Sequence, residues 1–344
     1  MRALFRYCLW SFVSCLATAA ARADEVSDYY QGRTLTVMVA HEPGTGFDVY
    51  ARVLIRHLGR HVPGTPAVVV QNMPGAGGVT GANWLYNIAP RDGTVIATVV
   101  HTVMLDRLLN EQSAVRFDPN RFNWIGNIES SVGTCGISDR SGFKSFDDIL
   151  QREIVFGGAA ITGALSQGSF ALRNLVGAKI KMVHGYKGSA DMKLALTRGE
   201  IQGLCGLPIS TLKSFWRDAV EAGHYRPIIQ LNHEPHPWLG KIRHLYEFAK
   251  TDEDRQVFDL VFGSLVLGRI YMAPPELPAP RVKALRAAFD ATMKDAAFLA
   301  DAEKGQIEVS ATTGDEVAGL IRRYTSAPKS VVDRAIVAVK PDAK

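Results

Sequence analysis

The sequence is poor in cysteine, and its cysteines form no familiar metal-binding or redox spacing. Only four occur in 344 residues, and no two of them make a CxxC pair. This argues against a disulfide-rich scaffold, a zinc site or a thiol redox centre. Two of them, Cys135 and Cys205, lie in the strand-like stretches VGTCGIS and IQGLCGL. A disulfide between these two is one possibility, but the sequence does not report their separation, so their pairing stays open.

Long hydrophobic runs are confined to the N-terminus. Two arginines precede an apolar stretch at residues 8–20, and ARA at 21–23 places small residues at the two positions that determine cleavage. This pattern predicts a secretory signal peptide at 1–23, cleaved after Ala23, and therefore a periplasmic protein. A membrane anchor is less favoured because the run is shorter than the roughly 20 residues that span a bilayer. Lipidation at Cys15 is a weaker alternative still.

The chain also lacks a strong excess of charge of one sign. Its 39 basic and 34 acidic residues give a formal net charge of +5. The predicted signal holds three arginines and no acid, so 36 basic residues would face 34 acidic ones afterwards. Such a balanced chain is not expected to bind nucleic acid.

The signatures of nucleotide binding and catalysis are missing as well. GTGFDV lacks the third glycine of GxGxxG, GAGGVTG carries Thr80 in that place, and no GxxxxGK[ST] occurs, so no cofactor is predicted. Ser166 in ALSQG misses the GxSxG pattern because Ala164 replaces the first glycine. His57 and His61 have a spacing that could bind a metal, but no third ligand is evident nearby, so a surface or boundary pair is favoured.

What the sequence does contain is a regular alternation of apolar strands and amphipathic helices. The first series of strand-like runs lies at 34–40, 67–71 and 94–100, and a second at 133–138, 153–158 and 180–186. Alternation of this kind predicts α/β lobes whose sheets are mostly parallel and flanked by helices. We therefore expect two lobes with a ligand site between them. The strand at 226–232 would return the chain to the first, which gives lobe 1 at 24–130 plus 226–344 and lobe 2 at 131–225.

Three glycine-rich loops, each between a strand and a helix, are the candidate binding elements. They read HEPGTGFD at 41–48, NMPGAGGVTG at 72–81 and GGAAITGALS at 157–166. Ligands of open parallel sheets sit beyond the carboxyl ends of the strands, where helix N-termini offer unpaired N–H groups to an anion. Glycines that only make tight turns are the alternative for any single loop. The candidate ligand-binding residues are Gly44, Thr45, Gly46, Phe47, Asp48, Gly77, Gly78, Ala160, Ile161, Thr162, Gly163 and Ser166.

Asp48 needs separate treatment because a carboxylate would repel a bound carboxylate. We expect it to accept backbone N–H bonds and shape its own loop. The alternative is that it engages a hydroxyl, a water or an ammonium group of the ligand.

Four ordered motifs resemble a known family. PGTGFDVYARVL, VQNMPGAGGVTGANWL, APRDGT and YKGSADMKLALTRGEI are together similar to the Bug-type extracytoplasmic solute receptors of tripartite tricarboxylate transporters. The resemblance runs from about Tyr30 to about Ala335. It implies a two-lobed Venus-flytrap fold of the periplasmic-binding-protein type.

The resemblance also implies a function. Members of this family bind organic carboxylates and deliver them to a membrane permease, and backbone amides of the first glycine loop hold one carboxylate. Two departures concern this chain: Thr45 stands where a glycine is usual, and GEIQGLCGLP lacks the Asp-Asn that is usual near Gly206. We expect a monomeric binding protein rather than an enzyme. A sensor for a membrane partner is the alternative, and a periplasmic hydrolase using Ser166 is a weaker one.

Overall fold

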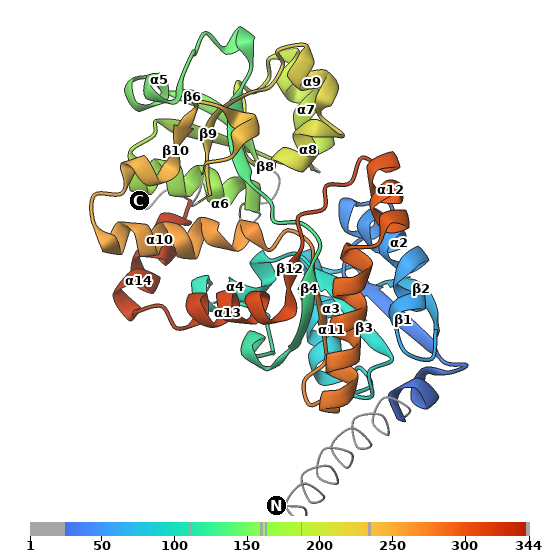
Figure 1. Ribbon diagram of the computed structural model, residues 1–344. Coiled ribbons are helices and arrows are strands. Elements are labelled where there is room, and N and C mark those ends of the chain that lie inside the picture. Colours follow the sequence, from blue (N-terminus) through green and yellow to red (C-terminus); the bar gives the residue numbers. More distant parts are fainter. Residues whose placement is uncertain are drawn as a thin grey trace, which may run out of the picture.

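The computed structural model describes residues 25–110, 112–158, 161, 164–186, 188–232 and 235–341. The predicted signal peptide at 1–23 lies outside the described residues. Over the described ranges the chain folds into two lobes, a lower one and an upper one in Figure 1. No helix in this part of the chain has both the length and the apolar character needed to cross a membrane.

A six-stranded mixed sheet forms the centre of the first lobe, counted over the described residues. Its spatial order is β12-β4-β11-β3-β1-β2, and β11 runs antiparallel to both of its neighbours. Both faces of β1 are buried: Val37 and Val39 face one core, and Met38 faces the other. The strands span β1 Thr34–Val39, β2 Ala67–Asn72, β3 Val95–Val99, β4 Asn123–Asn127, β11 Ile270–Ala273 and β12 Thr312–Thr313.

Helices cover both faces of this sheet. One face packs against α2 (Gly46–Leu58), α11 (Ala279–Met293) and α12 (Ala296–Lys304), and the other against α3 (Val79–Asn87), α4 (Thr102–Leu109) and α13 (Gly314–Thr325). Apolar strands without alternation are the expected signature of a sheet buried on both faces.

The second lobe repeats this design with a sheet in the order β10-β9-β5-β8-β6-β7. The strands span β5 Gly133–Ile137, β6 Ile154–Gly158, β7 Ile180–His184, β8 Gly203–Pro208, β9 Arg226–Gln230 and β10 Arg243–His244. The helices span α5 Phe146–Gln151, α6 Ala164–Ala171, α7 Ser189–Arg198, α8 Ile209–Lys213 and α9 Arg217–Glu221, with a π-helical turn at Leu172–Val176. The prediction of a two-lobed α/β fold is thus confirmed, with sheets that are mixed.

The strand predicted to return the chain to the first lobe belongs instead to the second. β9 pairs antiparallel with β5, and Ile228, Ile229 and Leu231 are buried in the core of the second lobe. The chain re-enters the first sheet only at β11, after α10 (Asp252–Phe262). The expected placement of 226–232 in lobe 1 was therefore wrong, because an apolar strand does not reveal from its sequence which sheet it will join.

Two C-terminal elements connect the lobes. Helices α10 and α14 (Lys329–Ala338) pack against each other and lie along the junction in Figure 1. Val331 of α14 is buried in the first lobe, whereas Ala338 is buried in the second. Arg334 of α14 forms an ion pair with Asp254 of α10, whose pKa falls to about 2 chiefly because of that bond.

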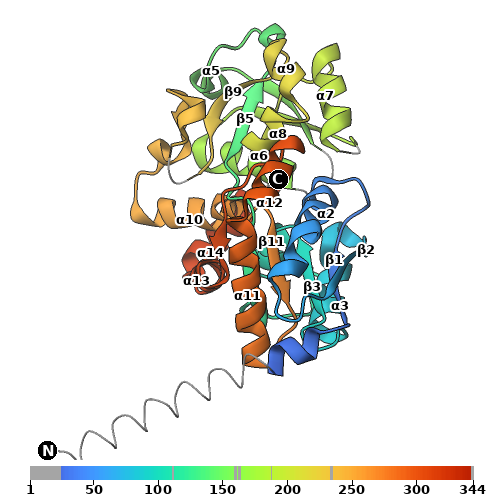
Figure 2. The same ribbon diagram turned by 45° about the vertical axis from the view of Figure 1, so that its right-hand side comes forward.

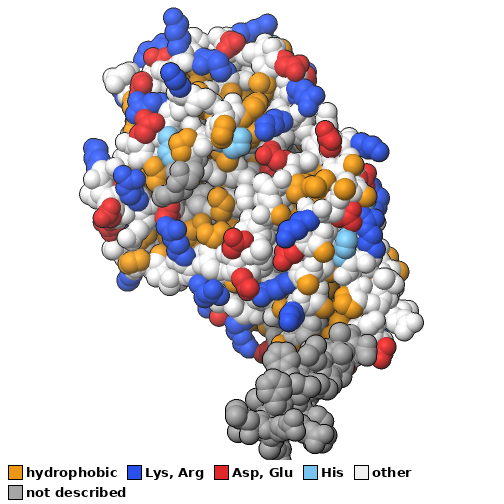
Figure 3. Space-filling model, viewed as in Figure 1, with side chains coloured by type: hydrophobic (Ala, Val, Ile, Leu, Met, Phe, Trp, Pro, Cys, Tyr) orange, Lys and Arg blue, Asp and Glu red, His pale blue; other side chains and the backbone are white. Residues whose placement is uncertain are grey.

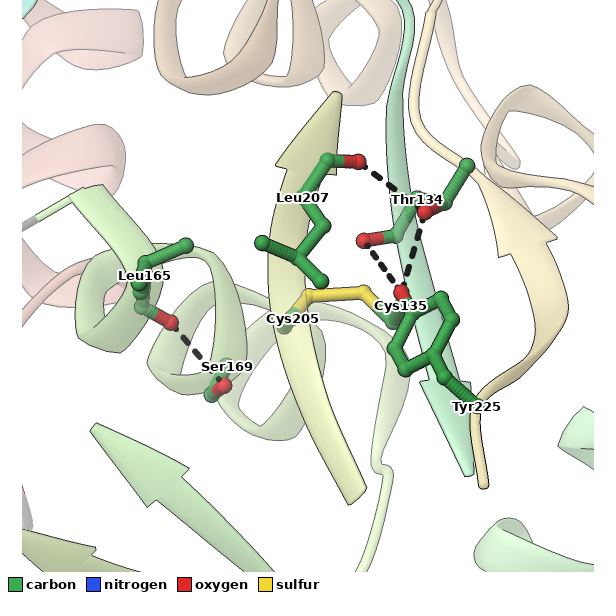
Figure 4. The surroundings of a disulfide bond; sticks show 7 residues. All are labelled: Thr134, Cys135, Leu165, Ser169, Cys205, Leu207 and Tyr225. Carbon is green, nitrogen blue, oxygen red and sulfur yellow. Dashed lines mark hydrogen bonds between the residues drawn. A yellow bond between two sulfur atoms is a disulfide. The ribbon is translucent and has the colours of Figure 1, made fainter. Parts of the chain in front are cut away.

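The structure joins Cys135 and Cys205 in a disulfide (Figure 4). The two residues lie opposite each other on the antiparallel strands β5 and β8, and both are fully buried. Beside them the Thr134 hydroxyl donates to the Leu207 carbonyl and lies 3.0 Å from the Tyr225 hydroxyl. The disulfide therefore fixes the centre of the second sheet.

Candidate functional site

The candidate site lies at the edge of the first sheet that faces the second lobe. β1 and β3 end at this edge, and α2 starts just beyond it, in blue below the upper lobe in Figure 2. β11 runs the opposite way, so its first residue, Ile270, lies opposite Val99 and Asn127 at the ends of β3 and β4. Side chains from four separate stretches of sequence therefore lie at this edge: His41 and Asp48 from residues 41–48, then His101, Glu129 and Arg269.

Asp48 holds the β1–α2 loop together. Its carboxylate accepts hydrogen bonds from the Gly44 N–H and from Arg52 Nε, both at 2.8 Å, and from Asn72 Nδ2 at 3.0 Å. Burial alone would raise the pKa of Asp48, but these bonds, led by that of Arg52, hold it below its usual value. The prediction that Asp48 shapes its own loop is confirmed. Asp48 is 2% exposed, and its carboxylate is already occupied by donors from the loop, from α2 and from β2.

The first turn of α2 presents unpaired backbone donors. The first N–H groups of a helix have no partner within the helix. Thr45, the residue before the helix, does not cap it, because its hydroxyl donates to the Glu42 carbonyl. The N–H groups of Gly46, Phe47 and Asp48 have no hydrogen-bond partner among the described residues. A helix of 13 residues therefore points three free donors and the positive end of its dipole at this edge.

The β2–α3 loop, unlike the start of α2, uses backbone N–H groups in hydrogen bonds of its own. Four consecutive residues, Gly75 to Gly78, have positive φ angles of 142°, 46°, 63° and 100°. This backbone turns the Gly78 N–H onto the Gly75 carbonyl at 2.9 Å and the Val79 N–H onto the Ala76 carbonyl. The Gly78 N–H is therefore used within the loop, and the assignment of Gly78 to the ligand site stays a prediction. Gly77 stays a prediction.

The second-lobe loop is described only in part. Ala160, Thr162 and Gly163 lie outside the described residues. Ile161 is 49% exposed. It lines a cavity of about 290 Å³ with Leu109 and Asn110 of the first lobe. The loop thus reaches the junction of the lobes, and its role in ligand binding stays a prediction.

Ser166 shows no catalytic arrangement. Its side chain is fully buried, and its hydroxyl has no hydrogen-bond partner among the described residues. A nucleophilic serine needs a base within hydrogen-bond reach. The hydroxyl instead lies against Gly158, where an added Cβ would approach it to 2.4 Å.

His57 near the end of α2 and His61 in the 3-10 turn Gly59–His61 that follows it both contact the α12 region. His57 Nε2 lies 2.8 Å from Asp301, and His61 Nε2 lies 2.7 Å from Asp295, both on or beside α12. Within the described ranges, no group of three or more His, Cys, Asp or Glu side chains is placed to hold a metal ion.

Sequence reasoning missed four side chains at this edge. His41 and His101 each lie two residues after the end of a strand, β1 and β3, and that position was the signal that could have found them. His41 stacks on Phe47, with ring centroids 4.3 Å apart. Burial first, and the charge of Arg269 second, lower the pKa of both histidines to about 4, so both are neutral near pH 7.

Arg269 and Glu129 are the other two. The Arg269 guanidinium lies over the rings of Phe47 and Tyr50, 4.5 and 4.7 Å from their centroids. Glu129 is 1% exposed and lies in the segment that leads from β4 into the second lobe. It accepts a hydrogen bond from Ser210, the second residue of α8. No sequence motif marks either residue.

Comparison with known proteins agrees with this architecture. No protein-family model matches the chain. A crystal structure of a TctC solute-binding protein from Polaromonas superimposes with a TM-score of 0.67 at 15% identity, covering 88% of this chain and 99% of that one. MatC from Rhodopseudomonas palustris, solved with bound malate, gives 0.63 at 17% identity over 88% and 99%. The chain therefore has the two-lobed α/β fold of periplasmic binding proteins.

Two sequence relatives match part of this chain. The UPF0065 protein in the gbd 5' region of Cupriavidus necator is 26% identical over 221 residues, which are 62% of this chain and 63% of that protein. BugT of Bordetella pertussis is 46% identical over 68 residues, 20% of each chain. The matched segments thus span less than two thirds of either relative. The chain is thus similar in sequence to a UPF0065 protein and to a Bug protein over part of its length, and it shares the fold of a TctC protein and of BugD.

Proposed function

We propose that this protein is a periplasmic solute-binding protein that captures a small organic carboxylate between its lobes and delivers it to a tripartite tricarboxylate-type permease. The observation that carries the proposal is the first turn of α2, where three N–H groups have no partner among the described residues. Such a helix start favours an anion by roughly 0.3–1 kcal/mol, and by up to about 2 kcal/mol when partly buried. Arg269 adds a full positive charge beside it.

The carboxylate assignment draws further support from relatives of the same fold. MatC was solved with malate, and a second R. palustris protein, Rpa4515, was solved with adipate. Basic and acidic side chains are interspersed over the face shown in Figure 3, so this surface carries no strong field of one sign that would favour a polyanion over a small acid.

Closure of the lobes supplies the mechanism of capture. Ser210 of the second lobe already contacts Glu129 in the connecting segment, and Lys213 of α8 lies 3.9 Å from Glu308 of the first lobe. A ligand that touches both lobes binds the closed state better than an open one, and this difference in affinity shifts the population towards closure. The closed form is the one that we propose the permease recognises.

A thermal-shift panel tests the proposal. Mono-, di- and tricarboxylates are screened against the mature chain, each beside its uncharged amide as a matched control. At 100 times its Kd, a ligand stabilises the folded state by about 2.7 kcal/mol, which raises the Tm by several degrees. We expect one class of acid to raise the Tm and its amide to leave it unchanged. If every acid leaves the Tm unchanged, the proposed function is wrong.

A further inference from the structure

Arg269 is fixed in place by its backbone and its neighbours. Its N–H donates to Asn127 Oδ1 at 2.8 Å, and one terminal nitrogen donates to the Gly268 carbonyl at 2.7 Å. The side chain is only 14% exposed. A cation held in this way has lost most of its contact with water, so its remaining donors favour an anionic partner.

The guanidinium lies directly beside the free donors of α2. A Cβ added at Gly46 would approach the Arg269 terminal nitrogen to 3.0 Å, so Arg269 borders the first residue of the helix. One anion at this point would meet both the guanidinium and the helix amides. Arginine suits this role because its planar group presents five N–H donors, of which Nε has no hydrogen-bond partner among the described residues.

Glu129 is the second unusual feature. One of its oxygens takes the Ser210 hydroxyl, whereas the other, Oε2, has no hydrogen-bond partner in the described part of the chain. Oε2 lies 3.9 Å from Arg269 Nε, beyond hydrogen-bond distance. The two charges therefore balance each other while leaving donors on one group and an acceptor on the other. A carboxylate that is 1% exposed is stabilised by a donor for that oxygen. The Tyr50 hydroxyl, whose pKa is raised first by burial and then by the charge of Glu129, is a neighbouring donor, and a donor on the ligand would join it at this carboxylate.

A carboxylate without a hydrogen-bond donor nearby would satisfy Arg269 but not the free oxygen of Glu129. Bound at Arg269, it would place a second negative charge beside Glu129, which is repulsive. A hydrogen-bond donor on the carbon next to the carboxyl group removes the conflict, because it lies beside its own carboxylate and can reach the free oxygen of Glu129. His41 and His101 are neutral near pH 7 and add no positive charge to this balance.

We propose that Arg269 and Glu129 select the ligand as a pair. Arg269 and the first-turn amides of α2 take the carboxylate, and Glu129 takes a donor on the adjacent carbon. The ligand is then an acid that carries an α-ammonium or α-hydroxyl group. This inference rests on the proposed function and narrows it to a class of substrate.

Matched ligands test the selection in the wild-type chain. Titration calorimetry compares acids of the same carbon skeleton: succinate, malate and aspartate in one set, and propionate, lactate and alanine in another. Hydrogen bonds to charged groups predict that an α-substituted acid binds about 10- to 100-fold more tightly than its unsubstituted counterpart. The tighter of the amino and hydroxy acids identifies which donor Glu129 accepts. If the unsubstituted acids bind as tightly as the substituted ones, the inference is overturned.

Variants then assign the two roles. Glu129→Gln keeps the size of the side chain, and we expect it to reduce the preference for the α-substituted acid to less than about threefold. Arg269→Gln is expected to weaken all carboxylates at least about tenfold, with partial recovery in Arg269→Lys. If Glu129→Gln keeps the full preference, or Arg269→Gln leaves carboxylate affinity unchanged, the assignment is wrong.

Arg281 provides the matched control. It also lies over a tyrosine ring, 3.4 Å from the centroid of Tyr29, and donates to a main-chain carbonyl, that of Asp92. It lies in the first turn of α11, and its partner Asp92 precedes β3, so Arg281 is near the opposite edge of the sheet. Arg281→Gln is expected to leave every affinity within about twofold, since rim or remote charges contribute little to binding. A wild-type chain that binds no carboxylate refutes the proposed function. One that binds carboxylates without an α-substituent preference refutes only this inference.

Discussion

The two glycine-rich loops at the edge of the first sheet use their N–H groups in opposite ways. In the β1–α2 loop, Asp48 ties down Gly44 and leaves the first N–H groups of α2 without a partner among the described residues. In the β2–α3 loop, a run of positive φ angles folds the N–H groups onto the loop's own carbonyls. Glycine residues before a helix thus allow the backbone to turn. A buried side chain such as Asp48 determines whether the backbone N–H groups at the start of the helix remain without a partner.

Removal of the Asp48 charge should have the largest effect. Asp48→Asn leaves one accepting oxygen for three donors, so we expect a loss of about 2–4 kcal/mol in the free energy of unfolding and ligand binding at least about tenfold weaker. Urea unfolding and titration calorimetry measure the two effects. Arg52→Gln is the matched control: Arg52 is half exposed, so the loss should stay below about 1 kcal/mol. Equal losses in the two variants would contradict the role given to Asp48.

Acid pH should lower the free energy of unfolding because of the buried histidines at this edge of the first sheet. His101 has a folded-state pKa of about 4, below the value of about 6.5 expected for an unfolded chain. Its contribution to stability is complete above pH 6.5 and is lost as the pH falls towards 4, because the unfolded chain takes up the proton first. Between pH 7 and pH 5 this amounts to about 2 kcal/mol. Urea unfolding at both pH values should show a smaller difference in His101→Gln than in the wild type, and an unchanged difference would contradict the assignment.

Two glycine-to-alanine changes separate the loops most cleanly. Gly78 has a φ of +100° with no atom closer than 3.6 Å to an added Cβ, so Gly78→Ala should cost about 1–2 kcal/mol of stability through strain alone. Its ligand affinity should stay within about twofold, since its N–H is consumed in the loop. Gly46→Ala should do the reverse: the new Cβ crowds Arg269 and weakens binding about tenfold, or 1.4 kcal/mol, at nearly unchanged stability. Urea unfolding and titration calorimetry of both variants measure the two effects. Weaker ligand binding in Gly78→Ala would contradict the proposed difference between the two loops.

Thr45 should matter least. Its hydroxyl donates to the Glu42 carbonyl at an exposed position and does not cap α2. Thr45→Ala is therefore expected to change stability by less than about 0.5 kcal/mol and affinity by less than about twofold. Calorimetry that shows a large loss of affinity would mean that the hydroxyl reaches the ligand.

Much of the fold could be predicted because its signals are local. The apolar run of β1, the glycine turn and the helical pattern from Asp48 onwards are contiguous, so each element reveals its neighbour. The placement of β9 could not be predicted in this way, because its pairing with β5 joins residues about 90 positions apart.

The residues of the candidate site also differ in whether a short stretch of sequence is enough to predict them. Asp48 and the start of α2 follow from one short stretch of sequence. Arg269 and Glu129 do not, because they are separated by 140 positions and meet only through the pairing of β11 with β4. Arg269 also escapes the rule that sites form after parallel strands, since it precedes an antiparallel one. A search for charged residues at both ends of every strand would have found it.

A crystal structure of the mature chain with its tightest-binding acid is the most direct test of the proposed carboxylate site at the start of α2. We expect a carboxylate within hydrogen-bond distance of the Gly46 and Phe47 N–H groups and of the Arg269 guanidinium. A carboxylate held elsewhere, with the start of α2 making no contact to the ligand, would contradict it.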